Sequence, residues 1–443
     1  CWLPVQGWRP LAVPVMAQGQ VVDLAVWGGS GHVTVEVDAP FLDVEGVTLT
    51  ATMAGVGVAE LTDVYTGATA SVTLEVVAPV EAEFFVKGDY LGYLDVDTGG
   101  DVTGDGLPDA VIGWGESHLG GFQAGAVFVY AADSDGVVSE PVQTLLGLGR
   151  QDRFGKQVHV RDMTQDGIPD LLVGAPLNDQ SASNAGSVYL FEGQTDGLFS
   201  DSPTLVWSGE TGSDQFGWSL TACDFNGDGL EDLAVGGYRA ENRDLDPRFD
   251  DQGRISIFLG TLSGPGLVAS QTLDGHVLNG DAGWEPRANL RLGWSLAAGD
   301  IDGDGYCDLV ASAERPFSNA LSGAVFVYRG QPAEGFTLGG VTSLPALALM
   351  SPGDSDGRLG SGRHGSSLEV ADLDEDGYAD IIVAERYADG YAVADDGSVG
   401  TPSKGGRVWL VPGDMLTAST AVSWTSTDEV ILLHGGNSAS DTE

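Results

Sequence analysis

Five stretches of the sequence place aspartate, or another side chain that carries oxygen, at alternate positions and a glycine at the sixth position. They run from Asp101 to Asp109, Asp162 to Asp170, Asp224 to Asp232, Asp300 to Asp308 and Asp372 to Asp380. Alternating oxygens can surround one hard cation if the backbone turns sharply, and glycine readily adopts the positive φ of such a turn. Oxygen ligands of this kind suit Ca²⁺. The sequence therefore predicts five calcium-binding loops.

Each loop is expected to bind the ion through side chains at positions 1, 3, 5 and 9 and through the backbone carbonyl of position 7. The predicted ligands are Asp101, Thr103, Asp105, Leu107 and Asp109; Asp162, Thr164, Asp166, Ile168 and Asp170; Asp224, Asn226, Asp228, Leu230 and Asp232; Asp300, Asp302, Asp304, Tyr306 and Asp308; Asp372, Asp374, Asp376, Tyr378 and Asp380. The last two loops carry four aspartates each and are predicted to bind most tightly. The alternative is a set of plain acidic turns, since Asp and Gly favour turns, but five copies in one register favour metal binding.

The residues after each loop exclude an EF-hand, which needs a glutamate at position 12 and a helix on either side. Position 12 is instead Ile112, Val173, Val235, Ala311 and Val383. Each of these lies in a short apolar run that is typical of a buried strand. The loops are therefore predicted to join strands of β-hairpins.

A larger unit repeats around the loops. Eight residues before the first aspartate stands Phe154-Gly155, Phe216-Gly217, Leu292-Gly293 or His364-Gly365, and Leu91-Gly92 lies two residues further back in the first copy. A third and a fourth apolar strand follow each loop, with a period of roughly 60 to 75 residues. Four strands per repeat indicate the blades of a β-propeller. The predicted blades are 89–150, 151–212, 213–288, 289–360 and 361–436.

The second unit carries the pattern of a known family in full: Phe154-Gly155, a loop ending at Asp170, Gly174-Ala175-Pro176 and a strand through Tyr189. This order resembles the FG-GAP repeat, best known from the propellers of integrin alpha subunits. The resemblance covers about residues 84 to 443. It implies that the loops between first and second strands lie on a lower face, and that the upper face meets ligands. It also implies further blades beyond residue 443, since integrin propellers have seven.

The predicted fold is all-β, with a small β-sandwich before the propeller. Residues 1–18 form a lead, 19–82 a sandwich that resembles bacterial immunoglobulin-like domains, and 83–443 the propeller. The resemblance of the sandwich rests on alternating stretches such as 21–27 and 70–77, separated by glycine and aspartate turns. A degenerate blade is the alternative for this region. Residues 83–88 are placed like a fourth strand that closes a propeller, so the chain is expected to be an incomplete one.

Composition restricts the class of partner. The chain has 65 acidic and 19 basic residues and a formal net charge of -46, which would repel nucleic acid. No apolar run approaches the roughly 18 residues that a membrane span needs. The acidic composition fits an extracellular setting, and the resemblance to bacterial immunoglobulin-like domains implies a bacterial protein that is secreted or held at the cell surface. The cysteines are too few for a disulfide framework, and Cys223 and Cys307 occupy non-equivalent positions in their repeats, so both are expected to be free and buried.

The sequence offers no catalytic constellation. The six histidines are scattered without metal-ligand spacing. Residues Gly353 to Gly357 match the Gly-x-Ser-x-Gly pattern, but no strand precedes them and no helix follows, so a turn is the better interpretation. The chain is predicted not to be an enzyme.

Most arginines fall in the loops assigned to the upper face, together with several aromatic residues. Arginine and aromatic side chains are enriched where proteins bind partners. We expect a protein or glycan partner with anionic groups at this face, and the predicted ligand-binding residues are Tyr238, Arg239, Arg243, Trp284, Arg287, Arg291, Arg315, Arg386 and Tyr387. In the alternative, these arginines pair with acidic residues of their own loops, and the chain is a structural spacer or the non-catalytic propeller region of a larger secreted enzyme.

Overall fold

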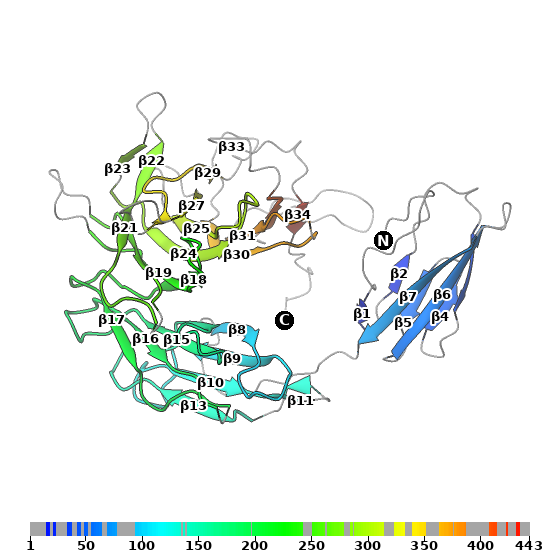
Figure 1. The fold of residues 1–443 in the computed structure, drawn as a ribbon, viewed down its shortest axis with the longest axis horizontal. Coiled ribbons are helices and arrows are strands. Elements are labelled where there is room, and N and C mark those ends of the chain that lie inside the picture. The colour runs from blue at the N-terminus through cyan, green and yellow to red at the C-terminus, as the bar shows by residue number, and fades with distance from the viewer. Residues whose placement is uncertain are drawn as a thin grey trace, which may run out of the picture. The chain divides into compact units, whose positions relative to one another are not determined.

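The computed structural model divides the chain into two units, Cys1–Phe84 and Phe85–Glu443, and each is described by itself (Figure 1). In the first unit the structure describes only the strands. In the second it describes residues 94–133, 136–137, 140–195, 197–241, 250–261, 264–278, 284–286, 288–313, 323–332, 339–350, 363–374, 376–386, 407–413, 422–423 and 431–434. All elements in these ranges are β-strands.

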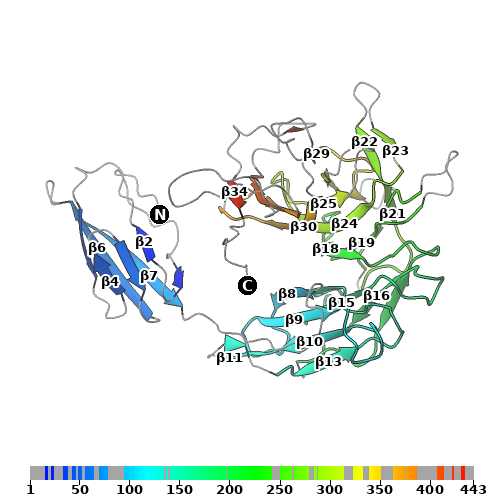
Figure 2. The ribbon, with the colours of Figure 1, turned by 180° about the vertical axis from the view of Figure 1, so that it is seen from behind.

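The first unit contains two sheets (blue in Figures 1 and 2). One has the order β1-β7-β6-β3 and the other β2-β5-β4. The strands are β1 (Val15–Ala17), β2 (Val21–Asp23), β3 (Val33–Val37), β4 (Leu42–Glu45), β5 (Thr48–Ala51), β6 (Gly55–Asp63) and β7 (Thr69–Val77). Neighbouring strands pair antiparallel except β1 and β7, which are parallel. The immunoglobulin-like assignment stays a prediction.

The second unit is a β-propeller of five blades, as the sequence predicts. Four-stranded antiparallel blades form from β8 (Leu94–Gly100), β9 (Asp109–Trp114), β10 (Ala126–Tyr130) and β13 (Gln143–Leu146); β14 (Gln157–Arg161), β15 (Asp170–Ala175), β16 (Ser187–Phe191) and β17 (Leu205–Ser208); β18 (Ser219–Cys223), β19 (Asp232–Gly237), β20 (Arg254–Phe258) and β21 (Gln271–Asp274); β24 (Leu292–Gly299), β25 (Asp308–Ala313), β26 (Ala324–Tyr328) and β29 (Leu347–Met350); β30 (Arg363–Ala371), β31 (Asp380–Arg386), β32 (Arg407–Val411) and β34 (Ile431–His434).

Short additional strands decorate the blades. Three of the pairs are β11 (Ala132–Asp133) with β12 (Gly136–Val137), β22 (His276–Leu278) with β23 (Trp284–Pro286), and β27 (Gly330–Gln331) with β28 (Gly340–Val341). A further strand, β33 (Val422–Ser423), adds to the edge of β29. Residues 83–88, which the sequence places like a closing strand, lie outside the described residues.

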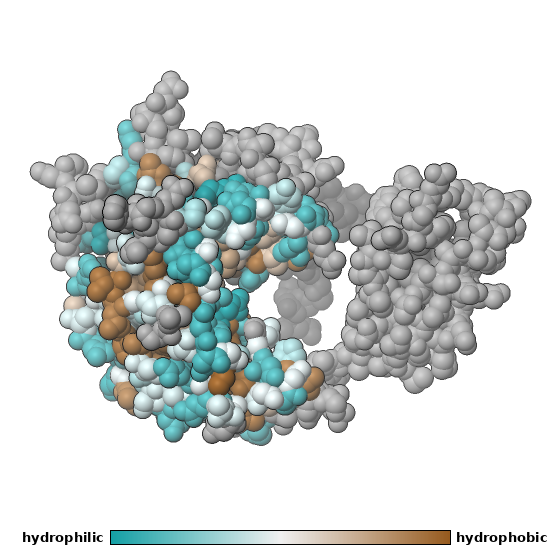
Figure 3. Space-filling model, in the orientation of Figure 1, coloured by the Kyte–Doolittle hydropathy of each residue, from teal (hydrophilic) through white to brown (hydrophobic). Residues whose placement is uncertain are grey.

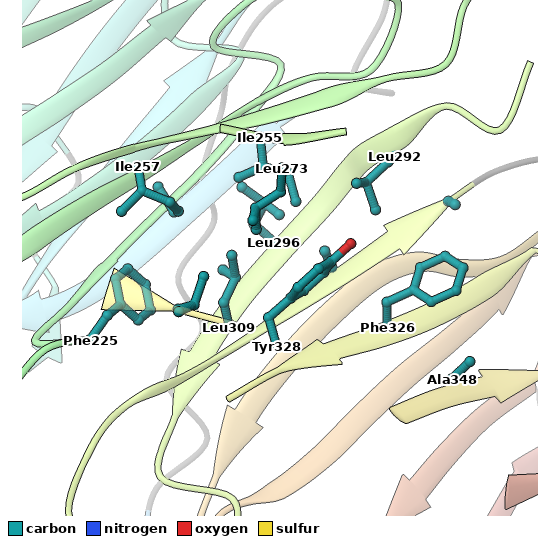
Figure 4. Packing of buried hydrophobic residues seen from close by; sticks show 14 of the residues in the cluster. Phe225, Ile255, Ile257, Leu273, Leu292, Leu296, Leu309, Phe326, Tyr328 and Ala348 are labelled. Atoms are coloured by element: carbon teal, nitrogen blue, oxygen red, sulfur yellow. The ribbon is translucent and has the colours of Figure 1, made fainter. Parts of the chain in front are cut away.

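The second strand of each blade is apolar along its length because both of its faces pack against neighbouring blades. Every residue of β9, β15, β19 and β25 is buried. Between the third and fourth blades, Ile255, Ile257 and Leu273 meet Leu309 and Tyr328 (Figure 4). This two-sided burial explains why the sequence shows short apolar runs after each loop instead of strict alternation.

The Phe-Gly motif joins consecutive blades at the upper face. Phe154 is buried, and its backbone N–H donates to the carbonyl of Ala124 in the preceding blade. Gly155 has φ of 82°, and a Cβ there would lie 2.4 Å from the carbonyl oxygen of Ala126. Both the backbone conformation and the close approach therefore require glycine. The leucine of Leu292-Gly293 is equally buried, so this variant preserves the contact.

The first strands β8, β14, β18, β24 and β30 line a central cavity of about 720 Å³. A hollow is visible at the centre of the described blades, among mostly hydrophilic residues (Figure 3). Adjacent first strands also bond through side chains, since Asp95 Oδ2 accepts a hydrogen bond from the backbone N–H of Val158 at 2.7 Å. This order leaves the loops between first and second strands on one face, the lower face. The loops between second and third strands, and those between blades, lie on the upper face.

The prediction of free cysteines is wrong, because Cys223 and Cys307 form a disulfide with their Cα atoms 6.0 Å apart. Cys223 precedes the third loop and Cys307 is position 8 of the fourth. These positions differ within the repeat, yet they meet across the joint between blades, where the Cys307 N–H donates to the carbonyl of Asp224. A comparison of equivalent positions in the repeats could not reveal a contact between non-equivalent ones.

Candidate metal centres

Each predicted loop joins the first and second strands of its blade, and the five loops fold alike. In the first loop, Asp101 accepts hydrogen bonds from the backbone N–H groups of Asp105 at 3.0 Å and Gly106 at 2.7 Å. Asp105 in turn accepts one from Leu107 at 2.8 Å. The equivalent bonds occur in the other four loops. These bonds curl the backbone around the alternating oxygens, as the sequence predicts.

The glycine at position 6 is required by backbone conformation and not by space. Gly106 has φ of 90°, and a Cβ there would have no heavy atom within 4 Å. The other four glycines at this position also have positive φ. Any other residue would therefore strain the turn that brings positions 1, 3 and 5 together.

The closing aspartate at position 9 ties the loop to the third strand of the blade. Asp170 is fully buried; its Oδ2 accepts from the Thr164 N–H at 2.9 Å and its Oδ1 from the Gly193 N–H at 2.8 Å, just beyond β16. Asp109, Asp232, Asp308 and Asp380 are also buried and form corresponding pairs of bonds. A single side chain therefore links the metal loop to the sheet.

Burial makes two of these closing carboxyls reluctant to ionise. Burial raises the pKa of Asp232 to about 7, although hydrogen bonds from Gly260 and Phe225 oppose the shift. In the same way burial raises the pKa of Asp308 to about 6, opposed by the Gly330 N–H and by Arg329. A bound cation would favour the ionised form of both. The buried carboxyls therefore fit a site that holds a cation.

Position 3 distinguishes the loops. Among the described residues, three carboxylates come together in two places, Asp300 with Asp302 and Asp304, and Asp372 with Asp374 and Asp376, with ligand oxygens within 4.8 Å of one another. Thr103, Thr164 and Asn226 supply neutral oxygens at this position in the other loops. Thr103 Oγ1 and Asp302 Oδ1 are buried and form no hydrogen bond. Buried oxygens without partners inside an acidic turn suit a cation ligand better than a plain turn.

One charged residue at these loops escaped the sequence analysis. The guanidinium Nη1 of Arg329 lies 2.9 Å from Asp302 Oδ2 and 2.8 Å from Asp308 Oδ2. Arg329 directly follows β26, far from the loop in sequence. The residues at the same place in the other blades are Ala131, Glu192, Leu259 and Pro412. An alignment of the repeats would have shown a lone cation at this position.

The predicted upper-face residues are only partly described. Arg239 Nε and Arg291 Nη2 lie 3.4 and 3.3 Å from the two oxygens of Asp251. Tyr238 is 9% exposed, and its ring packs 4.7 Å from that of Trp218 and 4.8 Å from that of Trp294. Trp284 and Arg386 lie on β23 and β31, whose backbone alone is described there, and Arg243, Arg287, Arg315 and Tyr387 lie outside the described residues. In the described part, the arginines are therefore matched by acid and the tyrosine is packed.

A search of the described residues for a membrane-spanning helix finds none of sufficient length and apolarity. The Gly353 to Gly357 segment lies outside the described residues.

Family models match the chain in four separate stretches and in a fifth that overlaps the first two. The model of the FG-GAP repeat matches residues 154–191, 216–258, 292–328 and 364–411, and the model of the FG-GAP-like repeat matches 176–235. The four FG-GAP stretches fall in the second to fifth blades. The first blade departs from the motif at both of its conserved places, with Leu91-Gly92 for Phe-Gly and Gly113-Trp114 for Gly-Ala-Pro.

Curated relatives share this region. Integrin alpha-5 of Xenopus laevis is 33% identical over 238 residues, which is 52% of this chain and 19% of the relative. Phosphatidylinositol-glycan-specific phospholipase D of Mus musculus is 27% identical over 363 residues, 65% of this chain and 42% of the relative. Among solved structures, the Dos1 propeller matches 87% of this chain and 82% of its own, at 9% identity and a TM-score of 0.33. The chain spans less than half the length of both curated relatives. Four of the five blades of its propeller match the FG-GAP repeat, in agreement with the Phe-Gly and loop pattern.

Proposed function

We propose that this chain is a calcium-binding propeller, secreted or held at the cell surface, that serves as an adhesion or ligand-binding module. The observation that carries the proposal is the loop geometry. Five loops curl their backbone around alternating oxygens, and Thr103 Oγ1 and Asp302 Oδ1 are buried there without a hydrogen-bond partner. The side chains of positions 1, 3, 5 and 9 and the carbonyl of position 7 would hold the ion.

Calcium would act here as a structural ion. It would offset the repulsion among the carboxylates and stiffen the turn between the first two strands of each blade. With a dissociation constant of about 0.1 mM at roughly 1 mM free calcium, each site contributes about 1.4 kcal/mol to the free energy of unfolding. Five such sites contribute about 7 kcal/mol, which is comparable to the whole stability of an average domain.

The Cys223–Cys307 disulfide supports a location outside the cytoplasm. Disulfides form and persist in oxidising compartments and are rare in reducing ones. Extracellular fluids also hold calcium at the millimolar level that weak structural sites require. The net charge of -46 fits such a setting and disfavours nucleic acid as a partner.

We place the partner at the upper face and expect it to be a protein or glycan with anionic groups. The similarity to integrin alpha-5 supports an adhesion role for the propeller. Arg243, Arg287, Arg315, Arg386 and Tyr387 carry this expectation, because Arg239 and Arg291 are already matched by Asp251. We assign no catalytic role to this chain.

A second candidate is the non-catalytic propeller region of a larger secreted enzyme. The similarity to phosphatidylinositol-glycan-specific phospholipase D, over 65% of this chain, favours it. In that case the propeller would position a catalytic domain and the upper face need not bind a separate ligand. A plain spacer would likewise lack a binding face.

Calorimetric titration of the metal-free protein tests the metal part of the proposal. About five calcium ions should bind, and Asp→Ala at position 1 of one loop should remove one ion. If calcium addition produces no heat of binding in the wild type or in the Asp→Ala variants, the loops are plain acidic turns.

The binding part needs a second assay. Replacement of Arg287 and Arg386 by Ala should abolish adhesion to an anionic cell surface or matrix while the melting temperature stays constant. A matched control is Arg254→Ala, since Arg254 is tied to Asp274 at 2.8 Å within the third blade. Adhesion that survives the double replacement would favour the spacer or the enzyme-bound propeller.

A further inference from the structure

The fourth loop contains a cation that the chain itself supplies. Arg329 Nη1 lies within 3 Å of both Asp302 Oδ2 and Asp308 Oδ2, and the arginine side chain is only 17% exposed. Nη1 donates a hydrogen bond to Asp308, so this is a charge-assisted contact. Asp302 and Asp308 are positions 3 and 9 of the loop, two of its predicted calcium ligands.

The backbone holds Arg329 in place on both sides. The Arg329 N–H donates to Thr342 Oγ1 at 3.2 Å, and the N–H of the next residue, Gly330, donates to Asp308 Oδ1 at 2.9 Å. The guanidinium is therefore anchored beside the loop by the same aspartate that it contacts. These bonds fix the backbone from which the side chain extends, so the guanidinium is always within reach of the two carboxylates.

The fifth loop offers a matched comparison. It has the same four aspartates, and its closing Asp380 accepts from the Leu373 N–H at 3.1 Å as Asp308 accepts from Ile301 at 3.2 Å. Its counterpart of Arg329 is Pro412, which carries no charge. The fourth loop therefore has a built-in positive charge that the fifth lacks. The loops also differ at position 4, Gly303 against Glu375, and at position 8, where Cys307 is disulfide-bonded, so Arg329→Gln within the fourth loop isolates the effect of the guanidinium.

We propose that Arg329 is a tethered cation that takes over part of the role of calcium in the fourth loop. This inference rests on the calcium binding proposed above. It has two consequences: the fourth loop binds calcium more weakly than the fifth, although both carry four aspartates, and it keeps its shape better when calcium is removed. Counting carboxylates predicts equal affinities and overlooks the guanidinium.

Two backbone amides report on the two loops in one sample. Gly305 donates to Asp300 Oδ2 at 2.8 Å and Gly377 to Asp372 Oδ2 at 3.0 Å. In protein labelled with ¹⁵N-glycine, calcium titration should move the Gly377 signal at a calcium concentration about fivefold lower than the Gly305 signal, the effect of a partly exposed ion pair. Arg329→Gln should lower the Gly305 midpoint about fivefold and leave Gly377 unchanged. Arg329→Lys, which keeps the charge, should change neither midpoint.

The outcomes separate this inference from the proposed function. If both glycines titrate but Arg329→Gln leaves the Gly305 midpoint unchanged or raises it, Arg329 is a structural tie and the inference fails while calcium binding stands. If neither glycine responds to calcium, the proposed function fails. Should Arg329→Gln not fold, the double variant Cys223→Ser, Cys307→Ser in EDTA decides, because it removes the disulfide that restrains only the fourth of these two loops. Amide exchange at Gly305 must then be slower than at Gly377, and equal or faster exchange overturns the inference.

Discussion

The lower and upper faces of this propeller come from the same blades and treat charge in opposite ways. On the lower face, carboxylates gather in turns of their own backbone, and in the fifth loop Asp372, Asp374 and Asp376 come together without an arginine at the place of Arg329. On the upper face, Arg153 lies 2.9 Å from Glu116, and Asp251 serves both Arg239 and Arg291. The proposed calcium would therefore serve the lower face, whereas Arg153, Arg239 and Arg291 on the upper face already have acidic partners.

This difference shows that local arrangement, and not the count of charges, decides where an ion is needed. Both faces are rich in aspartate. Among the described residues, the two places where three carboxylates come together both lie in lower-face loops, whose backbone N–H groups bond to the aspartates. On the lower face, Arg329 brings the same pairing of arginine with carboxylate to the fourth loop.

Removal of calcium should lower the free energy of unfolding most, because it empties all five lower-face sites at once. A loss of about 7 kcal/mol lowers the melting temperature of the unit Phe85–Glu443 by about 10 °C, and calorimetry in EDTA and in 2 mM calcium measures it. An identical melting curve in both conditions would show that the lower face needs no ion.

Opening the disulfide should come second. It links the third and fourth loops on the lower face and closes a chain segment of 84 residues. Cys223→Ser with Cys307→Ser should cost about 2 to 4 kcal/mol of unfolding free energy, measured by denaturant titration. Wild-type protein in a reducing agent is the control and should match the variant; a stability equal to that of the oxidised wild type would argue against the bond.

Lowering the pH should weaken calcium binding. The metal-free pKa of Asp232 is about 7 and that of Asp308 about 6, so these carboxyls take up protons between pH 8 and 5 and calcium must displace them. Affinity at those loops should fall about tenfold per pH unit below each pKa.

Folding stability of the metal-free protein should depend on pH in the opposite direction from calcium affinity. A carboxyl with a raised pKa favours the folded state at low pH, and that stability is lost as the pH rises through the folded-state pKa. The stability of the protein in EDTA should therefore fall from pH 5 to pH 8, while added calcium stabilises more at pH 8. Calorimetry at both values measures the two trends, and a calcium effect larger at pH 5 than at pH 8 would contradict them.

The smallest effect is expected on the upper face. Asp251→Ala leaves Arg239 and Arg291 without this partner and should cost about 1 kcal/mol, since both pairs are partly exposed. The number of bound calcium ions should not change. A calcium stoichiometry altered by this variant would mean that the two faces are coupled.

Much of the fold could be predicted because the information is local. The Phe-Gly pairs, the loop glycines and the apolar runs after the loops act within one blade, and each repeats in register. The strands following the loops, such as Asp170–Ala175 and Asp232–Gly237, lie where the sequence predicts them. The five-bladed propeller and the FG-GAP assignment are confirmed, whereas calcium binding and the ligand face stay predictions.

The sequence by itself determined the elements that repeat, and the tertiary structure decided what meets across the joints between blades. The residue before one loop faces position 8 of the next: a Cβ on Gly100 would lie 3.3 Å from Pro169, the next joint brings Arg161 near Glu231, and the third holds the Cys223–Cys307 disulfide. The same backbone geometry thus places a close approach, an attraction between opposite charges and a disulfide at three successive joints. The contact of Arg329 with Asp302 is also non-local. The residues of each blade determine its own strands and loop, but the contact partner of a residue between two blades depends on how those blades pack.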